Sequence, residues 1–209
     1  MNAPTPRTVR LLRDGLAALG VDGACAPMLW RYLGELEKWN ATYNLSGIRD
    51  LQGMVTRHVL DALAVLPDVR GRVIDVGSGP GIPGIILAIA NPALTVTTLD
   101  SNGKKARFMR HAQRTLDLPN LEVVEGRAEA YEPAARFDTV ISRAFAALGD
   151  FLGVTEALGA DDGRWLAMKG RLDADERGDI PAGFRVIETK ALSVPGLNEA
   201  RHLIIATRT

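Results

Sequence analysis

Apolar residues recur at two different spacings along this chain, and the spacing changes near residue 67. Before that point they return every three or four positions, which is typical of amphipathic helices. Three such runs cover residues 11–19, 28–39 and 51–66, and Pro67 ends the third. We therefore expect a helical N-terminal region over residues 1–67.

After residue 67, short β-branched runs alternate with helical segments. Strands are expected at residues 73–76, 94–99, 121–124, 137–142 and 164–168, with helices at 84–90, 104–116 and 148–158. Two last strands, 184–192 and 202–207, are joined by a Pro-Gly turn and form a hairpin at one edge. This alternation predicts that residues 68–209 form an α/β domain with a parallel sheet and helices on both faces.

Composition narrows the class of protein. The chain has 209 residues, of which 46% are hydrophobic and 24% charged, as in ordinary globular domains. The longest apolar run falls far short of the ~20 residues that span a bilayer, and no signal peptide is visible. Cys25 is the single cysteine, which fits a reducing compartment. We expect a cytoplasmic protein; its oligomeric state is left open, with a monomer as the working expectation.

The most informative segment is the glycine-rich stretch Asp75–Gly84, which follows a strand and leads into a helix. Such a turn brings backbone close to a nucleotide-like cofactor. NAD(P) and S-adenosylmethionine both compete for it, because Gly79-Pro80-Gly81-Ile82-Pro83-Gly84 matches G-x-G-x-x-G and Asp100 lies 21 residues past Gly79. The two prolines remove N–H donors that a pyrophosphate needs, and Asp75 would repel it. S-adenosylmethionine is therefore favoured, and Asp100 is expected to accept hydrogen bonds from the two hydroxyls of its ribose.

Charge is balanced overall but unevenly distributed. The chain carries 25 basic and 25 acidic residues, yet residues 101–116 contain no acid. The cations of that run are Lys104, Lys105, Arg107, Arg110 and Arg114, with His111 beside them. They form either an ordinary solvated helix face or a contact surface for nucleic-acid phosphates.

Several separate motifs resemble the RsmG family, the ribosomal RNA small subunit methyltransferase G proteins also called glucose-inhibited division protein B. In chain order these are Lys38-Trp39-Asn40, Asn44-Leu45-Ser46, Arg57-His58 with Asp61, Asp75–Gly84, Leu99–Lys105, Gly126-Arg127-Ala128-Glu129, Phe137-Asp138, Ser142-Arg143-Ala144 and Lys169-Gly170. The resemblance covers nearly the whole chain. Two positions depart from the family: Ser46 stands where Thr is usual, and Ala62 stands where Ser is common.

The resemblance implies a seven-stranded Rossmann-like class I methyltransferase fold and methylation of N7 of guanine 527 in 16S ribosomal RNA. The donor would be S-adenosylmethionine, and the partner 16S ribosomal RNA or the small ribosomal subunit. The implied cofactor residues are Gly77, Gly79, Ile82, Asp100, Ala128, Glu129 and Arg143. Candidate RNA contacts are Lys104, Lys105, Arg107, Arg110, Arg127, Lys169 and Arg201.

Direct methylation of guanine N7 makes limited chemical demands. N7 has an in-plane lone pair and no proton, so positioning and electrostatics are needed rather than a general base, and we expect no acid–base catalytic residue. His58, His111 and His202 are widely spaced and belong to no ligand motif, so no metal site is predicted. Alternatives are an NAD(P)-dependent oxidoreductase, a non-catalytic ribosome-binding module and, disfavoured by the basic run, a small-molecule methyltransferase.

Overall fold

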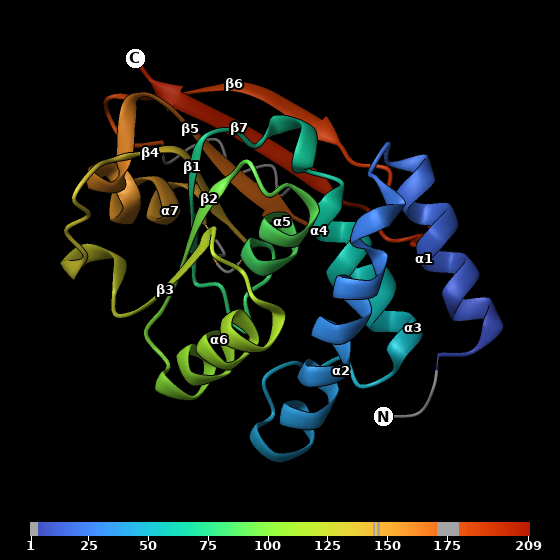
Figure 1. Cartoon of the computed structure of the whole chain (residues 1–209). Coiled ribbons are helices and arrows are strands. Elements are labelled where there is room, and N and C mark those ends of the chain that lie inside the picture. The colour runs from blue at the N-terminus through green and yellow to red at the C-terminus, as the bar shows by residue number, and fades with distance from the viewer. Residues whose placement is uncertain (1–3, 144, 146, 171–179) are drawn as a thin grey trace.

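The chain folds around one seven-stranded sheet with helices on both faces (Figure 1). This computed structural model describes residues 4–143, 145, 147–170 and 180–209. The strands are β1 (Arg72–Val76), β2 (Thr95–Asp100), β3 (Leu121–Glu125), β4 (Phe137–Ser142), β5 (Gly159–Lys169), β6 (Phe184–Ala191) and β7 (His202–Arg208). Their order is β3-β2-β1-β4-β5-β7-β6, and β1 to β5 pair in parallel. The predicted order of alternating strands and helices is confirmed.

The last two strands form the expected hairpin at one edge, in which β7 pairs with β5 and β6 is the edge strand. β7 pairs antiparallel with β5 on one side and with β6 on the other. Its middle residues Leu203–Ala206 are all buried, which is typical of a strand with both faces covered. β6 exposes several residues, including Ile187, as suits the outer position.

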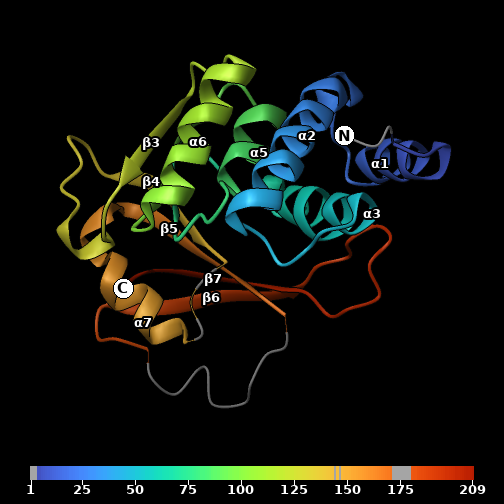
Figure 2. The same cartoon turned by 90° about the horizontal axis from the view of Figure 1, so that it is seen from below.

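The two faces of the sheet belong to two separate hydrophobic clusters. In β7, Leu203 and Ile205 belong to one cluster, whereas Ile204 and Ala206 belong to the other. The first cluster lies under α5 (Gly84–Ala90), α6 (Gly103–Leu116) and the N-terminal helices, and the second under α7 (Leu148–Thr155). Figure 2 shows this unequal covering of the two faces.

The N-terminal region packs on the sheet side that α5 and α6 also cover. It contains α1 (Pro6–Ala18), α2 (Ala26–Tyr43) and a third helix made of α3 (Leu51–Met54), a π-helical turn η2 (Val55–Leu60) and α4 (Asp61–Leu63). The short 3-10 turns η1 (Gly23–Cys25) and η3 (Leu66–Asp68) follow α1 and α4. Residues of these helices and of the sheet share one hydrophobic cluster. The expected boundary at residues 67 and 68 falls within η3.

After residue 67, two predicted bounds differ from the structure by more than one residue. β5 begins at Gly159 rather than at residue 164, because the chain already pairs with Phe137 there before the register shifts. α7 ends at Thr155, and a 3-10 turn, η5 (Glu156–Leu158), completes the predicted helical segment. A further 3-10 turn, η4 (Ala128–Ala130), follows β3. Among the described helices, none is long and apolar enough to cross a bilayer.

Candidate active site

The glycine-rich turn after β1 is fastened to the end of β2 by hydrogen bonds. The Gly77 N–H donates to the Leu99 carbonyl at 2.8 Å. The Ser78 hydroxyl donates to the Asp75 carbonyl at 2.7 Å and accepts from the Leu99 N–H at 3.1 Å. Gly79 has φ +61°, and a Cβ there would meet no atom within 4 Å. Backbone at Gly79 therefore faces open space, which leaves room for a ligand.

Asp75 and Gly84 set how closely α5 approaches the sheet. The Gly84 N–H donates to Asp75 Oδ2 at 2.8 Å, and a Cβ at Gly84 would come within 2.6 Å of the Thr98 side chain. Asp75 is fully buried, and this burial raises its pKa to about 7. Its other oxygen, Oδ1, has no hydrogen-bond partner among the described residues. A buried acceptor without a donor beside this turn fits a ligand that carries an amino group.

The N-terminal region also supports the turn, through a hydrogen bond from α2. Tyr32 of α2 is fully buried, and its hydroxyl donates to the Pro80 carbonyl at 2.8 Å. Proline has no N–H, so its carbonyl is the only backbone group that Pro80 offers for hydrogen bonding. One side chain of α2 therefore holds the middle of the glycine turn, which the apolar spacing of that helix alone did not reveal.

A cavity of about 310 Å³ opens beside this turn, at the carboxyl ends of β1 and β2. Its lining residues are Val76, Gly77, Leu99, Asp100, Ser101, Lys105, Gly126, Arg127, Ala128, Glu129, Phe145 and Val154. At this edge Asp100 is 6% exposed, and it accepts from the Gly79 N–H through Oδ2 at 2.8 Å and from the Asn102 N–H through Oδ1 at 2.9 Å. A carboxylate has further lone pairs, so the oriented Asp100 can still accept from a diol.

The structure brings together only some of the residues predicted for the cofactor. Gly77, Asp100, Ala128 and Glu129 line this first cavity, and Gly79 is bonded to Asp100. Ile82 is 2% exposed and lies within the hydrophobic cluster that includes α5. Arg143, which follows β4, lines a different cavity.

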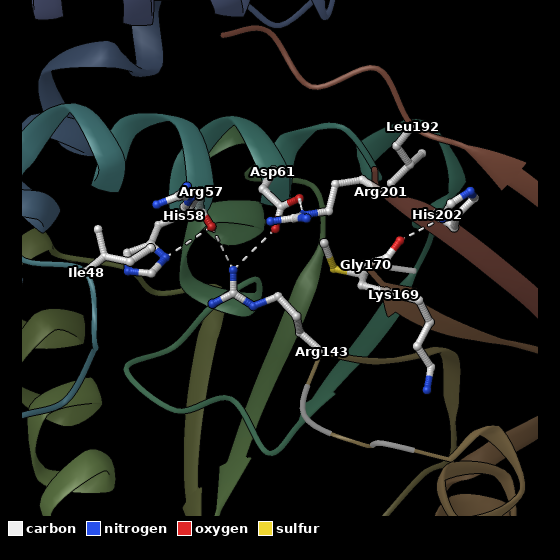
Figure 3. A pocket seen from close by; sticks show the side chains of 11 residues that line it. Ile48, Arg57, His58, Asp61, Arg143, Lys169, Gly170, Leu192, Arg201 and His202 are labelled. Carbon is white, nitrogen blue, oxygen red and sulfur yellow. Dashed lines mark hydrogen bonds and ion pairs between the residues drawn. The ribbon is translucent and has the colours of Figure 1, made fainter. Parts of the chain in front are cut away.

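This second cavity, of about 330 Å³, is lined by Arg143 and by residues of η2, α4, β5 and β7 (Figure 3). Phe145, between β4 and α7, lines the first cavity. Its backbone carbonyl accepts a hydrogen bond at 3.1 Å from Nζ of Lys169, which lines the second cavity. Ala144, part of the predicted motif, lies outside the described residues. The lining is Ile48, Arg57, His58, Asp61, Arg143, Met168, Lys169, Gly170, Leu192, Arg201 and His202.

The buried carboxylate of Asp61 binds two of the cations that line the second cavity, Arg143 and Arg201. Asp61 accepts from Arg143 NH1 at 3.4 Å through Oδ2 and from Arg201 Nε at 3.2 Å through Oδ1 (Figure 3). Burial raises the pKa of Asp61, and the two guanidinium groups oppose that rise. The side chains of Arg143 and Arg201 remain 29% and 20% exposed, so both guanidinium groups are partly open to solvent.

The π-helical turn η2 places a backbone carbonyl toward the same cavity. The Arg57 carbonyl accepts from Arg143 NH1 at 2.9 Å and lies 3.1 Å from His58 Nδ1. His58 Nε2 lies 2.8 Å from the Ser46 hydroxyl, whose oxygen already accepts from the Ile48 N–H. His58 therefore donates through Nδ1 and accepts at Nε2. Burial lowers its pKa to about 4, so His58 is a neutral, structural residue at pH 7.

Four of the seven predicted RNA-contacting cations line one of the two cavities. Lys105 and Arg127 line the first cavity, and Lys105 Nζ lies 3.5 Å from Asp100 Oδ2. Lys169 and Arg201 line the second. The others lie on α6, where Lys104 and Arg107 are exposed and Arg110 pairs with Glu125 at 3.0 Å.

His111, which shares the basic run, turns instead toward α2. Its Nε2 lies 2.8 Å from Glu35, and its ring centroid is 5.1 Å from that of Trp39. Lys38 and then His111 lower the pKa of Glu35 by hydrogen bonding. These contacts join α2 to α6.

The sequence did not single out Arg57 and Asp61 as site residues. Both stand in one of the quoted motifs, Arg57-His58 with Asp61, and that motif was the signal available for them. Their function at the second cavity depends on contacts with Arg143 and Arg201, which are 82 and 140 residues from Asp61 along the chain. Spacing within the motif could not indicate those contacts.

Solved structures similar to this one include a methyltransferase complexed with S-adenosyl-L-methionine. TrmN from Thermus thermophilus aligns with a TM-score of 0.57 at 20% identity, over 74% of this chain and 53% of that chain. The glycopeptide N-methyltransferase MtfA complexed with S-adenosyl-L-methionine aligns with a TM-score of 0.58 at 14% identity, over 73% of this chain and 87% of that chain. The fold is thus that of the Rossmann-like, S-adenosylmethionine-dependent class I methyltransferases, as expected.

Sequence comparison defines the family. The family model for rRNA small subunit methyltransferase G matches residues 26–204. Ribosomal RNA small subunit methyltransferase G of Stenotrophomonas maltophilia strain K279a is 52% identical over 206 residues, covering 98% of this chain and 97% of the relative. That of Pseudomonas syringae pv. tomato is 47% identical over 208 residues, covering 98% and 99%. The chain belongs to this family of methyltransferases, which confirms the predicted resemblance and the expected cofactor, S-adenosylmethionine.

Proposed function

We propose that this protein transfers a methyl group from S-adenosylmethionine to N7 of guanine 527, in the 530 loop of bacterial 16S ribosomal RNA. The proposal is carried by one observation: a cavity built on Asp100 and the glycine turn adjoins a second cavity lined by arginines. The first suits a nucleoside with a diol, and the second suits RNA. Family membership supports methyl transfer over hydride transfer at the same turn.

The proposed cofactor contacts begin at the glycine turn. Asp100 accepts hydrogen bonds from the ribose hydroxyls, while Gly77 and Gly79 allow backbone to approach the ligand. Asp75 Oδ1, buried and without a partner among the described residues, would accept from the amino group. Ala128 and Glu129, which line the first cavity, would lie beside the adenine. Ile82 supports the turn from the buried side, and Arg143 stands at the boundary with the second cavity.

When bound, S-adenosylmethionine supplies a methyl group on a sulfonium cation, and its methyl–sulfur bond breaks as the N7 lone pair forms the new bond. No proton is removed from the base, because N7 carries none. The residues of the chain are therefore required to align the base and to exclude water. The neutral, doubly hydrogen-bonded His58 is consistent with this, since it is held as a structural group.

The proposed RNA contacts are the cations at the mouths of the cavities and along α6. Lys104, Lys105, Arg107 and Arg110 lie on α6, Arg127 lies beside the first cavity, and Lys169 and Arg201 lie at the second. Phosphate contacts of this kind supply affinity and salt dependence, while the groove or pocket selects the base.

The test is transfer of labelled methyl from S-adenosylmethionine to unmethylated small ribosomal subunits, followed by borohydride and aniline cleavage at 7-methylguanine. A single cut in the 530 loop is the expected result. Label without a cut would retain the methyltransferase and refute N7 as the acceptor. If neither subunits nor deproteinised RNA accepted label while the cofactor bound, the protein would be a non-catalytic ribosome-binding module.

A further inference from the structure

Two arginines that line the second cavity, Arg57 and Arg201, pair with a carboxylate just outside it, that of Glu199. Arg57 NH2 is hydrogen-bonded to Glu199 Oε1, and Arg201 NH2 donates to Glu199 Oε2 at 3.0 Å. The two oxygens of one carboxylate thus each meet a different arginine. A phosphodiester offers two non-bridging oxygens in the same way, and guanidinium groups bind both kinds of oxyanion.

The guanidinium group of Arg201 is held in place independently of Glu199, and so is the backbone of Arg57. Arg201 is fixed by Asp61 at 3.2 Å, and the backbone of Arg57 is fixed by Arg143 at 2.9 Å. Glu199 is itself on an anchored loop, because Gly196 packs so closely against Leu11 and Thr56 that a Cβ there would lie 2.8 Å from the Leu11 side chain. Arg201 is therefore positioned without Glu199, and Arg57 is anchored through its backbone, so an anion can take the place of the Glu199 carboxylate between the two guanidinium groups.

Charge and exposure favour an anion at this position. Besides Asp61, the charged residues lining the cavity are cations: Arg57, Arg143, Lys169 and Arg201. Both Arg57 and Glu199 are about half exposed, at 45% and 47%, so their ion pair forms in water and is weak enough to exchange. Hydrogen bonds from Arg57 and then Arg201 lower the pKa of Glu199, so it is a carboxylate throughout the neutral range.

The walls of the cavity also fit a nucleotide. Ile48, Met168 and Leu192 add apolar surface to a space of about 330 Å³. Arg143 lines this space, and Phe145, two residues further along the chain, lines the first cavity. An RNA residue held here would lie next to a base presented to the first cavity.

We propose that Arg57 and Arg201 bind a phosphodiester beside the acceptor guanosine, and that Glu199 occupies these two arginines until RNA displaces it. This inference rests on the proposed function, because it takes RNA as the ligand. It assigns two residues, Arg57 and Glu199, that the sequence had not marked as site residues. It also predicts that removing an acidic residue from the site strengthens binding, which a purely structural ion pair would not do.

The test measures binding of the full chain to unmethylated small ribosomal subunits over a series of salt concentrations. Arg57→Ala is expected to weaken binding about tenfold and to reduce the slope of log affinity against log salt by about 0.7 to 1. Glu199→Gln is expected to tighten binding several-fold at low salt. The matched controls are Arg136→Ala and Asp161→Asn, from an exposed ion pair of 3.1 Å at the amino ends of β4 and β5. Neither control should change affinity.

Three results would overturn the inference. If Glu199→Gln weakened binding as much as Arg57→Ala, the pair would be structural; unchanged binding in both variants would also exclude a phosphate site. If instead both variants changed affinity only for S-adenosylmethionine, measured by calorimetry, the anion would be the carboxylate of the cofactor. Failure of the wild type to bind subunits at all would refute the proposed function itself, which separates the two conclusions.

Discussion

Replacing Asp100 by alanine tests the proposed cofactor site most directly. The carboxylate is 6% exposed and accepts from two backbone N–H groups, those of Gly79 and Asn102, at 2.8 and 2.9 Å. The Gly79 bond is buried, so alanine leaves that donor unsatisfied. An unsatisfied buried donor costs about 1–3 kcal/mol. The free energy of unfolding of Asp100→Ala should fall by that amount.

The effect on cofactor affinity is separate from this loss of stability. Each hydrogen bond from a ribose hydroxyl to a carboxylate contributes about 1.5–3 kcal/mol, and about 1.4 kcal/mol corresponds to a tenfold change in the dissociation constant. Loss of one such bond therefore predicts at least about tenfold weaker binding of S-adenosylmethionine, and loss of both predicts considerably more. Isothermal titration calorimetry measures this, and urea unfolding measures the stability change on the same preparation.

Glu125→Ala provides the matched control. Glu125 ends the neighbouring strand in register with Asp100, but its side chain pairs with Arg110 and does not line the cavity. Its affinity for the cofactor should equal that of the wild type. If folded Asp100→Ala also bound S-adenosylmethionine like the wild type, Asp100 would not be part of the cofactor site, and the assignment of the first cavity would be refuted.

Three further predictions concern buried polar groups. Tyr32→Phe leaves the Pro80 carbonyl without its donor and should lower the free energy of unfolding by about 1–3 kcal/mol in urea denaturation. The pKa of His58 is lowered from 6.5 to about 4, so its contribution to stability is lost as pH falls through that range; His58→Gln should show a weaker dependence there. The pKa of Asp75 is raised from 3.8 to about 7, so the wild type loses stability as pH rises between those values. Asp75→Asn lacks this loss, and its stability relative to wild type should increase with pH, by up to about 4 kcal/mol; an unchanged difference from pH 4 to 8 would contradict the burial argument.

The sequence by itself determined the class of fold and the family. Periodicity distinguished the helical region from the alternating strands and helices, because strand and helix repeats differ and each element buries one face. The glycine-rich turn follows the end of one strand, and Asp100 stands at the end of the next. Because the carboxyl ends of parallel strands lie at the same edge of a sheet, the sequence could assign both to one site. The family motifs then defined the family, which the comparisons confirm.

Tertiary structure alone decided how the site is divided. Arg143, Asp61 and Arg201 come from three distant parts of the chain, and only their packing shows that they form a second cavity rather than part of the first. The same holds for Tyr32 beneath the glycine turn and for β7 between β5 and β6. Local patterns specify which elements form, since those depend on neighbouring residues. Contacts between distant segments depend on how the elements pack, so the second cavity and the carboxylate just outside it became visible only in the folded protein.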